Sequence, residues 1–536
     1  MLGAGPERRA AQPQFNRARK GTDSPPAIWA SADRRVTVFM RHLRNCRDLR
    51  YYNRSRSFSR IHQNGECGMR SEKWTRLRRL GKGFAVTAGW CVLLAAATGS
   101  CWAQIEALSE IRDIVLDEDG GWCWFEGPRA VVHNGLLLAG SVASGHREPD
   151  RKGDIDLIVF DLRKEQASRV ELYDRLQLDD HDSPAIVRLM DGRWLAVFAR
   201  HGNDPHFYYR LSEPDNPLKW SEVKQYAPSP TTRLTYSNVF QLPRENGKIY
   251  NFFRGLDDSF KPSWVCSTDG GITWNTGNVF IQVPSEKKHR PYVRYVSDGW
   301  QTVHMAYTEG HPRDWDNSIY HVFYRDGMLH SSAGEPLAPL GQGLDSPDKG
   351  TRVFQGSPDA VAWCNDIALD RDGAPVIAYS VQMNSAGLPP RSGGLDMRYR
   401  WARWDGSSWR DYPLAYAGER LYPGEDDYTG LVSLVPGMPH IVLCSTNSNP
   451  VSGEPLVSRA DGKRHYEIFL GVTRDGGETW TWRAVTRDSN RDNLRPIALC
   501  TETEVLALYL SGTFRAFTDY AQAVRLARIP ITSIPD

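Results

Sequence analysis

The sequence predicts an all-β fold, a seven-bladed β-propeller, and three observations lead to it. Short runs of β-branched and aromatic residues fill the chain from about Ile105 to the end, with Asp-Gly or Asn-Gly pairs between many of them. No convincing long amphipathic helical pattern interrupts these runs. In addition, two of the turns share one longer motif, which is typical of propeller blades.

The turns between the apolar runs have the residues that hairpins require. "VVHNGLLLAG", "RLMDGRWLAVF" and "ALDRDGAPVIAYS" each place Asn-Gly or Asp-Gly between two apolar stretches. The central residues of such turns must tolerate a positive φ, which Gly, Asn and Asp adopt most readily. Many hairpins at similar spacing therefore imply one large all-β fold.

The shared motif is the Asp-box, S/T-x-D-x-G-x-T-W, in "STDGGITW" (267–274) and "TRDGGETW" (473–480). We expect its Asp to tie the turn backbone together and its Trp to pack between neighbouring sheets. The two boxes start 206 residues apart (473 minus 267). Blades of roughly 50 to 70 residues fit this separation, and the part of the chain after residue 104 then accommodates about seven blades.

The beginning of the chain has a different character. Residues 1–82 are rich in Arg and lack apolar periodicity, so we expect a basic extension without a packed core. Residues 83–104 have the basic, apolar and small-residue parts of a secretory signal, with Ala103 at the cleavage edge. The simplest interpretation is a translation start at Met69, with residues 1–68 as an upstream extension; a functional basic arm is the alternative.

The apolar run allows two other interpretations, an uncleaved membrane anchor and a lipid-modified Cys101 in "TGSC". Each of the three exports the residues after 104, so we expect a secreted or periplasmic protein, with no stable membrane partner unless Cys101 carries a lipid. The propeller domain then spans residues 105–536.

Composition excludes some classes of function. The chain has 66 Lys and Arg against 64 Asp and Glu, a net charge of +2, so no global field for nucleic acid is expected. Five of the nine cysteines follow residue 104, widely spaced and odd in number, which does not fit a disulfide framework. We expect most of them to be buried strand residues: Cys123, Cys266, Cys364, Cys444 and Cys500.

A resemblance extends over roughly residues 122–525. "DDHDSPAI", "ARHG", "TYSNVFQL", "FFRG", "RPYVRY", "TEGHPRDWDNSIYH" and the two Asp-boxes, in this order, resemble the Asp-box-repeat propeller family that includes ulvan lyases. The same superfamily contains enzymes that cleave rhamnose from glucuronic acid. The resemblance implies a polysaccharide lyase that acts on an acidic, uronic-acid-containing glycan by β-elimination, without an organic cofactor.

Such a lyase needs a base, an acid and a cation that holds the uronate carboxylate while charge builds up on it. By resemblance, His181 and Tyr236 match the proton-transfer pair and Arg254 matches the carboxylate neutraliser, with His201 as a second imidazole. Either a neutral His181 is the base and Tyr236 the acid, or Tyr236 does both. The non-catalytic alternatives are that His181 caps a turn, that Tyr236 is an ordinary surface tyrosine, and that Arg254 forms a surface ion pair.

The segment "RPYVRY" matches a substrate-contacting part of the family, so Tyr292, Arg294 and Tyr295 are candidates there, with the choice between the two tyrosines left open. The resemblance also implies a structural zinc site, in which four nitrogen and sulfur ligands close a tetrahedron. Its candidate ligands are His311, His321, Cys444 and His465. Four unrelated buried side chains are the alternative.

Three other functions compete with a lyase. An α-L-rhamnosidase or rhamnose–glucuronate lyase of the same superfamily would share the fold, and the reaction products distinguish a lyase from a hydrolase. A sialidase would need an early Arg-Ile-Pro motif, whereas the only such sequence begins at Arg528. A non-catalytic glycan-binding propeller would bind sugars without forming a double bond.

Overall fold

In the computed structural model of the chain, the described residues are 105–108, 110–127, 129–257, 259–283 and 290–534. The predicted basic extension (1–82), the start at Met69, the signal segment (83–104) and Cys101 lie outside them. Within the described ranges, no helix has the length and apolar character needed to cross a membrane.

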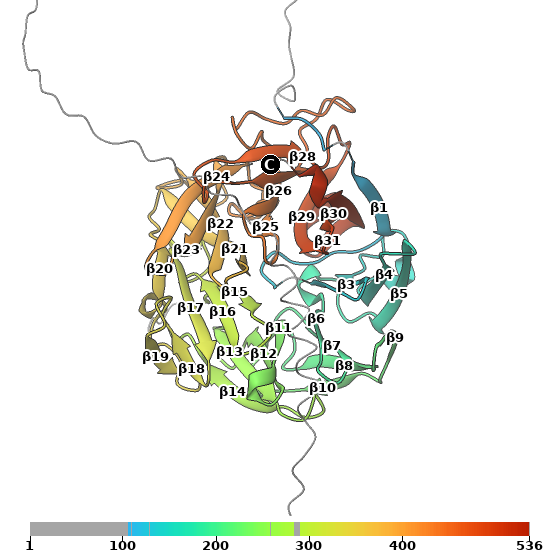
Figure 1. Cartoon of the computed structure of the whole chain (residues 1–536), viewed down its shortest axis with the longest axis vertical. Coiled ribbons are helices and arrows are strands. Elements are labelled where there is room, and N and C mark those ends of the chain that lie inside the picture. The colour runs from blue at the N-terminus through green and yellow to red at the C-terminus, as the bar shows by residue number, and fades with distance from the viewer. Residues whose placement is uncertain (1–104, 109, 128, 258, 284–289, 535–536) are drawn as a thin grey trace, which may run out of the picture. The chain divides into compact units, whose positions relative to one another are not determined.

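The described residues form seven antiparallel sheets arranged around a centre, which confirms the predicted seven-bladed propeller (Figure 1). Blades 1 to 3 are built from these strands: β2 (Ala130–His133), β3 (Leu136–Val142), β4 (Ile155–Asp161) and β5 (Gln166–Tyr173); β6 (Ala185–Arg188), β7 (Trp194–Ala199), β8 (Phe207–Glu213), β9 (Asn216–Trp220) and β10 (Lys224–Tyr226); β11 (Thr235–Leu242), β12 (Lys248–Arg254), β13 (Pro262–Ser267) and β14 (Asn275–Val279).

Blades 4 to 6 follow in chain order: β15 (Val293–Ser297), β16 (Thr302–Tyr307), β17 (Ile319–Arg325), β18 (Met328–His330), β19 (Pro336–Pro339) and β20 (Thr351–Phe354); β21 (Ala360–Leu369), β22 (Pro375–Met383), β23 (Met397–Trp404) and β24 (Trp409–Gly418); β25 (Val432–Leu434), β26 (Ile441–Thr446), β27 (Glu467–Val472) and β28 (Thr481–Ala484). Short 3-10 turns lie between strands: η2 (Pro149–Arg151), η3 (Asp180–Asp182), η4 (Pro243–Glu245), η5 (Pro347–Lys349) and η6 (Ile531–Ser533).

Blade 7 closes the ring with strands from both ends of the propeller. It contains β29 (Asp492–Cys500), β30 (Glu504–Ala516), β31 (Asp519–Pro530) and, as its outer strand, β1 (Arg112–Asp117). Strand β1 pairs antiparallel with β31, with Arg112 opposite Arg528. This pairing joins the first and last parts of the propeller without an open seam.

Both Asp-boxes have the predicted structure. The Asp269 carboxylate accepts hydrogen bonds from the backbone N–H groups of Ile272 and Thr273, each 3.0 Å from Oδ1. Trp274 packs edge-on against Phe207 of the neighbouring blade, with ring centroids 5.2 Å apart. In the second box the Asp475 carboxylate accepts from the backbone N–H and the hydroxyl of Thr479, and Trp480 lies against Trp401 of blade 5.

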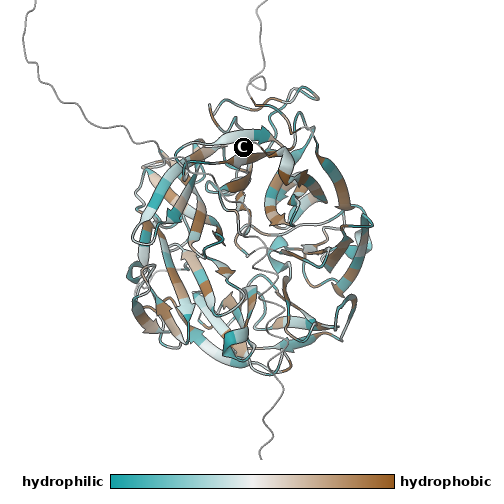
Figure 2. Cartoon of the chain, in the orientation of Figure 1, coloured by the Kyte–Doolittle hydropathy of each residue, from teal (hydrophilic) through white to brown (hydrophobic). Residues whose placement is uncertain are grey.

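The blades pack through apolar side chains that alternate with polar ones along the strands, which Figure 2 shows as brown and teal bands. Four of the five cysteines after residue 104 are buried in this packing and the fifth, Cys500, is half-buried. All five are free thiols, as the sequence predicts.

A segment between β1 and β2 fills the middle of the propeller. Trp124 packs against Tyr428, with ring centroids 4.2 Å apart, and its Nε1 donates to the Thr429 carbonyl oxygen at 2.7 Å. Phe125 stacks on Trp363 at 3.7 Å. Because these partners belong to different blades, the segment joins the starts of several inner strands into one buried aromatic cluster.

Candidate active site

Four of the predicted catalytic residues lie together at the end of the propeller where the inner strands start. The imidazoles of His181 and His201 are stacked, with centroids 3.8 Å apart and an interplanar angle of 9°. The Tyr236 ring lies 5.5 Å from the His181 ring. The guanidinium carbon of Arg254 is 5.0 Å from the Tyr236 centroid and 4.3 Å from that of Tyr292. Blades 2, 3 and 4 thus bring these residues together.

Asp179 holds the two imidazoles in place, and the sequence analysis missed it. Its Oδ1 lies 2.6 Å from Nδ1 of His181, and its Oδ2 lies 2.9 Å from Nδ1 of His201. Burial opposes the charge on Asp179, but the hydrogen bonds and charge of the two histidines hold its pKa below the usual range. The available signal was the acidic residue two positions before His181 in "DDHDSP".

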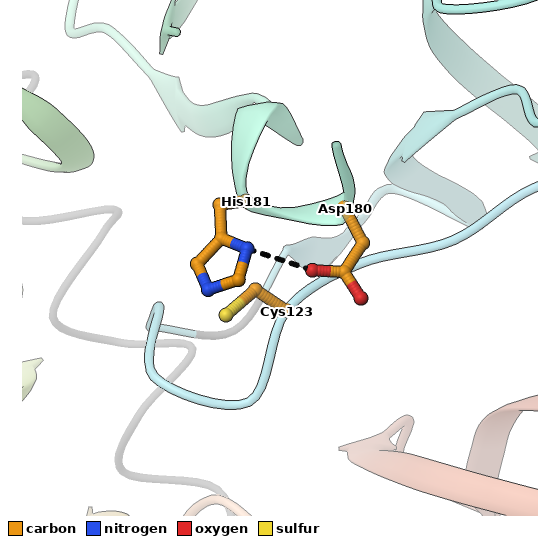
Figure 3. Close-up of side chains that lie close together, drawn as sticks. All are labelled: Cys123, Asp180 and His181. Atoms are coloured by element: carbon orange, nitrogen blue, oxygen red, sulfur yellow. Dashed lines mark ion pairs between the residues drawn. The ribbon is translucent and has the colours of Figure 1, made fainter. Parts of the chain in front are cut away.

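His181 is enclosed, with only 3 % of its side chain exposed. Its Nδ1 also lies 2.9 Å from Oδ1 of Asp180, and Cys123 lies beside the ring (Figure 3). Burial alone would lower the pKa of His181, but the neighbouring Cys123, Tyr236 and Asp179 raise that pKa well above its ordinary value. His181 is therefore an imidazolium at neutral pH.

His201 has the opposite electrostatic environment. Burial, the charge of His181 and the charge of Arg254 lower its pKa, and together they outweigh the hydrogen bond to Asp179. Its side chain is 29 % exposed, more than that of His181. Since Nδ1 bonds to Asp179, a neutral His201 has Nε2 available as a proton acceptor.

Tyr236 points into the cluster because the backbone bends at the start of β11. Its φ of 63° is unusual for a tyrosine, and the pairing with β12 shifts register between Thr235 and Asn238. Burial raises the pKa of Tyr236 well above its ordinary value, although the charges of His181 and Arg254 oppose this shift. The phenol is consequently protonated at neutral pH and can only donate its proton.

Arg254 presents an uncompensated donor at the cluster. Its Nε donates to the Phe260 carbonyl oxygen at 3.2 Å. Its Nη1 is buried and, among the residues that the structure describes, has no hydrogen-bond partner. An anionic group at this position would satisfy both the hydrogen bond and the charge.

Arg294 and Tyr295, the other two candidates in "RPYVRY", pack mainly against other parts of the propeller, although Tyr295 lines one small pocket with Tyr236 and Arg254. Tyr295 stacks on Phe252 at 5.2 Å in the core between blades 3 and 4. Arg294 donates from Nη1 to the Trp124 carbonyl oxygen at 2.7 Å and lies 3.5 Å from Asp366, so it fixes the central segment. Of the two candidate tyrosines, Tyr292 is the one whose ring lies against the Arg254 guanidinium.

The four candidate zinc ligands are not brought together. His321 contacts Ser332 and His304, at 2.8 Å and 3.1 Å, and His465 contacts Asp461 at 2.9 Å. Cys444 lies in an apolar core, and Nε2 of His311 lies 2.9 Å from Arg313. Each side chain already has separate partners on its own blade or loop, so the expected tetrahedron does not form among the described residues.

Two other groups have metal-ligand chemistry, Cys123 with Asp180 and His181, and Asp179 with His181 and His201. In each group the ligand atoms lie within 4.8 Å of one another. The first group fits a cation poorly, because Asp180 already pairs with the buried Arg495 at 2.7 Å, whose charge opposes a second positive charge there.

Comparison with known proteins identifies the family and the fold of the chain. The model of a family described as BNR repeat-containing matches residues 141–417, more than half of the chain. A solved PL25 ulvan lyase bound to -[GlcA(1-4)Rha3S]- has a TM-score of 0.54 at 15 % identity, over 77 % of this chain and 95 % of that one. The polysaccharide lyase Uly1 has a TM-score of 0.51 at 9 % identity, over 79 % and 100 %. No curated protein sequence matches.

Proposed function

The chain belongs to the BNR repeat-containing family, and from this premise we propose that it is a polysaccharide lyase that cleaves a uronic-acid-containing, ulvan-like glycan by β-elimination. The observation that carries the proposal is the joint position of His201, Tyr236 and Arg254, which supply a base, an acid and a cation at one place. The likeness to two lyases supports the fold on which this chemistry would operate.

Arg254 is the group that receives the uronate carboxylate. Its buried, unpartnered Nη1 stabilises the negative charge that moves onto the carboxylate when the neighbouring carbon loses its proton. Tyr292 keeps the guanidinium in place, since its ring lies 4.3 Å from the guanidinium carbon. A substrate without a carboxylate would leave this buried charge uncompensated.

His201 takes the proton, and its lowered pKa makes it the neutral member of the histidine pair at neutral pH. His181 stays charged and enclosed, so we assign it to holding Asp179 and the charge balance of the site. The sequence left two arrangements open, either His181 as the base and Tyr236 as the acid, or Tyr236 as both. The pKa shifts of the two histidines support a third arrangement, in which His201 is the base.

Tyr236 then protonates the leaving oxygen. The proton beside the carboxylate passes to Nε2 of His201, and the electron pair forms a double bond to the neighbouring ring carbon. The bond from that carbon to the glycosidic oxygen breaks, and the oxygen takes the Tyr236 proton. One fragment ends in an unsaturated uronate and the other in a hydroxyl, so no water is consumed.

The test is the ultraviolet absorbance of unsaturated products when the protein is incubated with uronic-acid polysaccharides. Arg254→Ala should lower kcat/KM by about 100- to 1000-fold, the usual effect of removing a group that stabilises developing charge. The matched control is Arg163→Ala, on an exposed turn between β4 and β5. Glycan cleavage without absorbance would indicate a hydrolase, and binding without cleavage a glycan-binding propeller.

A further inference from the structure

A cavity of about 760 Å³ opens at the same end of the propeller as the histidine pair. Its walls come mainly from three loops, between β16 and β17, between β22 and β23, and between β24 and β25, with Pro358, Val361 and Gln382 added from in and beside β21 and β22. Blades 4, 5 and 6 therefore contribute to it, while the catalytic cluster belongs to blades 2, 3 and 4. The volume is within the range of ligand-binding pockets.

One arginine links the cavity to the catalytic cluster. Arg313 lines the cavity, and its Nη2 lies 2.9 Å from Nε2 of His311 and 2.9 Å from Oε1 of Glu425. The His311 ring in turn packs edge-on against Tyr292, with centroids 5.5 Å apart. The cavity wall is thus linked through His311 to the tyrosine that contacts Arg254.

The polar groups of the cavity suit sugar hydroxyls. Gln382 donates from Nε2 to Oδ1 of the buried Asp427 at 2.5 Å, and burial raises the pKa of Asp427 to about 7. At neutral pH this carboxyl group can both accept and donate hydrogen bonds. Val361, Leu388 and several prolines supply apolar surface for the carbon face of a sugar ring.

The charges of the cavity do not suit an anion. Five carboxyl side chains line it against two guanidinium groups. The charge of Arg313 is balanced by Glu425, and Asp426 forms an ion pair with Arg420, which does not line the cavity. A sulfate ester or a second uronate would meet more carboxyl groups than guanidinium groups here, with Arg391 as the one lining arginine that has no ion pair among the described residues.

We propose that this cavity binds an uncharged sugar that neighbours the uronate in the polymer, and that it rejects a sulfated or acidic sugar at that position. The inference rests on the proposed function, since it names the sugar beside the uronate that Arg254 holds. It makes the protein selective for unsulfated stretches of a uronate polymer.

The test uses calorimetry with the full chain and a glucuronate–rhamnose oligosaccharide, sulfated or unsulfated. The unsulfated form should bind at least 10-fold more tightly. Ala386→Trp, which adds a large side chain at the exposed rim of the cavity, should weaken that binding at least 10-fold. The control Ala167→Trp lies on the exposed strand β5 of blade 1 and should change nothing, while thermal unfolding verifies that both variants fold.

The outcomes separate this inference from the proposed function. Equal affinity for the two forms, or unchanged binding by Ala386→Trp, would overturn the inference even if the protein releases unsaturated products. Binding that follows the expected pattern while no polymer yields an unsaturated product would support the cavity and reject the lyase. A second variant, Gln382→Ala, removes the donor to Asp427 and should also weaken binding of the unsulfated form.

Discussion

Asp179→Asn is the change that tests the histidine pair most directly. The carboxylate accepts from Nδ1 of both imidazoles, at 2.6 Å from His181 and 2.9 Å from His201. An asparagine offers one acceptor oxygen and one NH2 group, so one imidazole must lose its acceptor. A hydrogen bond to a charged group contributes about 1.5 to 3 kcal/mol, which at about 1.4 kcal/mol per factor of ten corresponds to roughly 10- to 100-fold in kcat/KM.

The same substitution should change the pH dependence. Without the carboxylate the pKa of His181 falls, because Asp179 is one of the groups that raise it. Initial rates of ultraviolet absorbance across the pH range would then show the alkaline limb of kcat/KM at lower pH. The matched control is Asp182→Asn. Burial, and after it the charge of Asp179, raise the pKa of Asp182 well above its ordinary value, so this side chain is neutral at neutral pH. The substitution therefore replaces one neutral group with another. A loss below 3-fold with an unchanged profile in Asp179→Asn would refute the assignment.

Three further predictions follow from the same contacts. The kcat/KM of the wild-type protein should rise with pH through a pKa below 6.5, as His201 loses its proton, and should fall only above the raised pKa of His181. A kcat/KM that rises steadily to pH 10 would contradict this assignment. Asp269→Ala should lower the free energy of unfolding, measured in urea, by about 1 kcal/mol. The pKa of Asp269 is lowered to about 2, so the stabilisation by its carboxylate is fully present above the unfolded pKa of about 4 and is lost as the pH falls through about 2. The variant and the wild type should therefore have the same stability in acid. His321→Ala should leave the zinc content of the purified protein unchanged by metal analysis, since the four expected ligands lie apart; a loss of one zinc per chain would show that they do assemble.

The sequence predicted the fold because its signals are local. An Asp-box is one hairpin, and the hydrogen bonds of Asp269 reach only three or four residues along the chain. Such a motif can be recognised in the sequence because its structure does not depend on contacts with distant residues. The hairpin turns behave in the same way: Asn134 and Gly135 both adopt the positive φ that their sequence indicates.

The site could be predicted only in part, because it depends on contacts between blades. The residues that were expected to be catalytic by resemblance lie close together, since each lies near the same end of its blade. The zinc ligands do not, because no local spacing supported them and their neighbours are fixed by loops, as with His321 and Ser332. Asp179 was missed because its place two residues before His181 does not reveal that the same carboxylate also reaches His201, 22 residues further along the chain.

The division of roles within the histidine pair follows from charge rather than from burial. Two positive charges about 4 Å apart repel by about 4 kcal/mol at an effective dielectric constant of about 20, or about 3 pKa units at roughly 1.4 kcal/mol each. The stacked rings therefore carry one positive charge, and so one extra proton, between them near neutral pH. Burial alone would place that proton on the more exposed His201. However, Nδ1 of His181 faces the carboxylates of both Asp179 and Asp180, whereas His201 shares only Asp179 and also faces Arg254. The proton therefore stays on the enclosed ring, and the ring that can reach a substrate is left as the base.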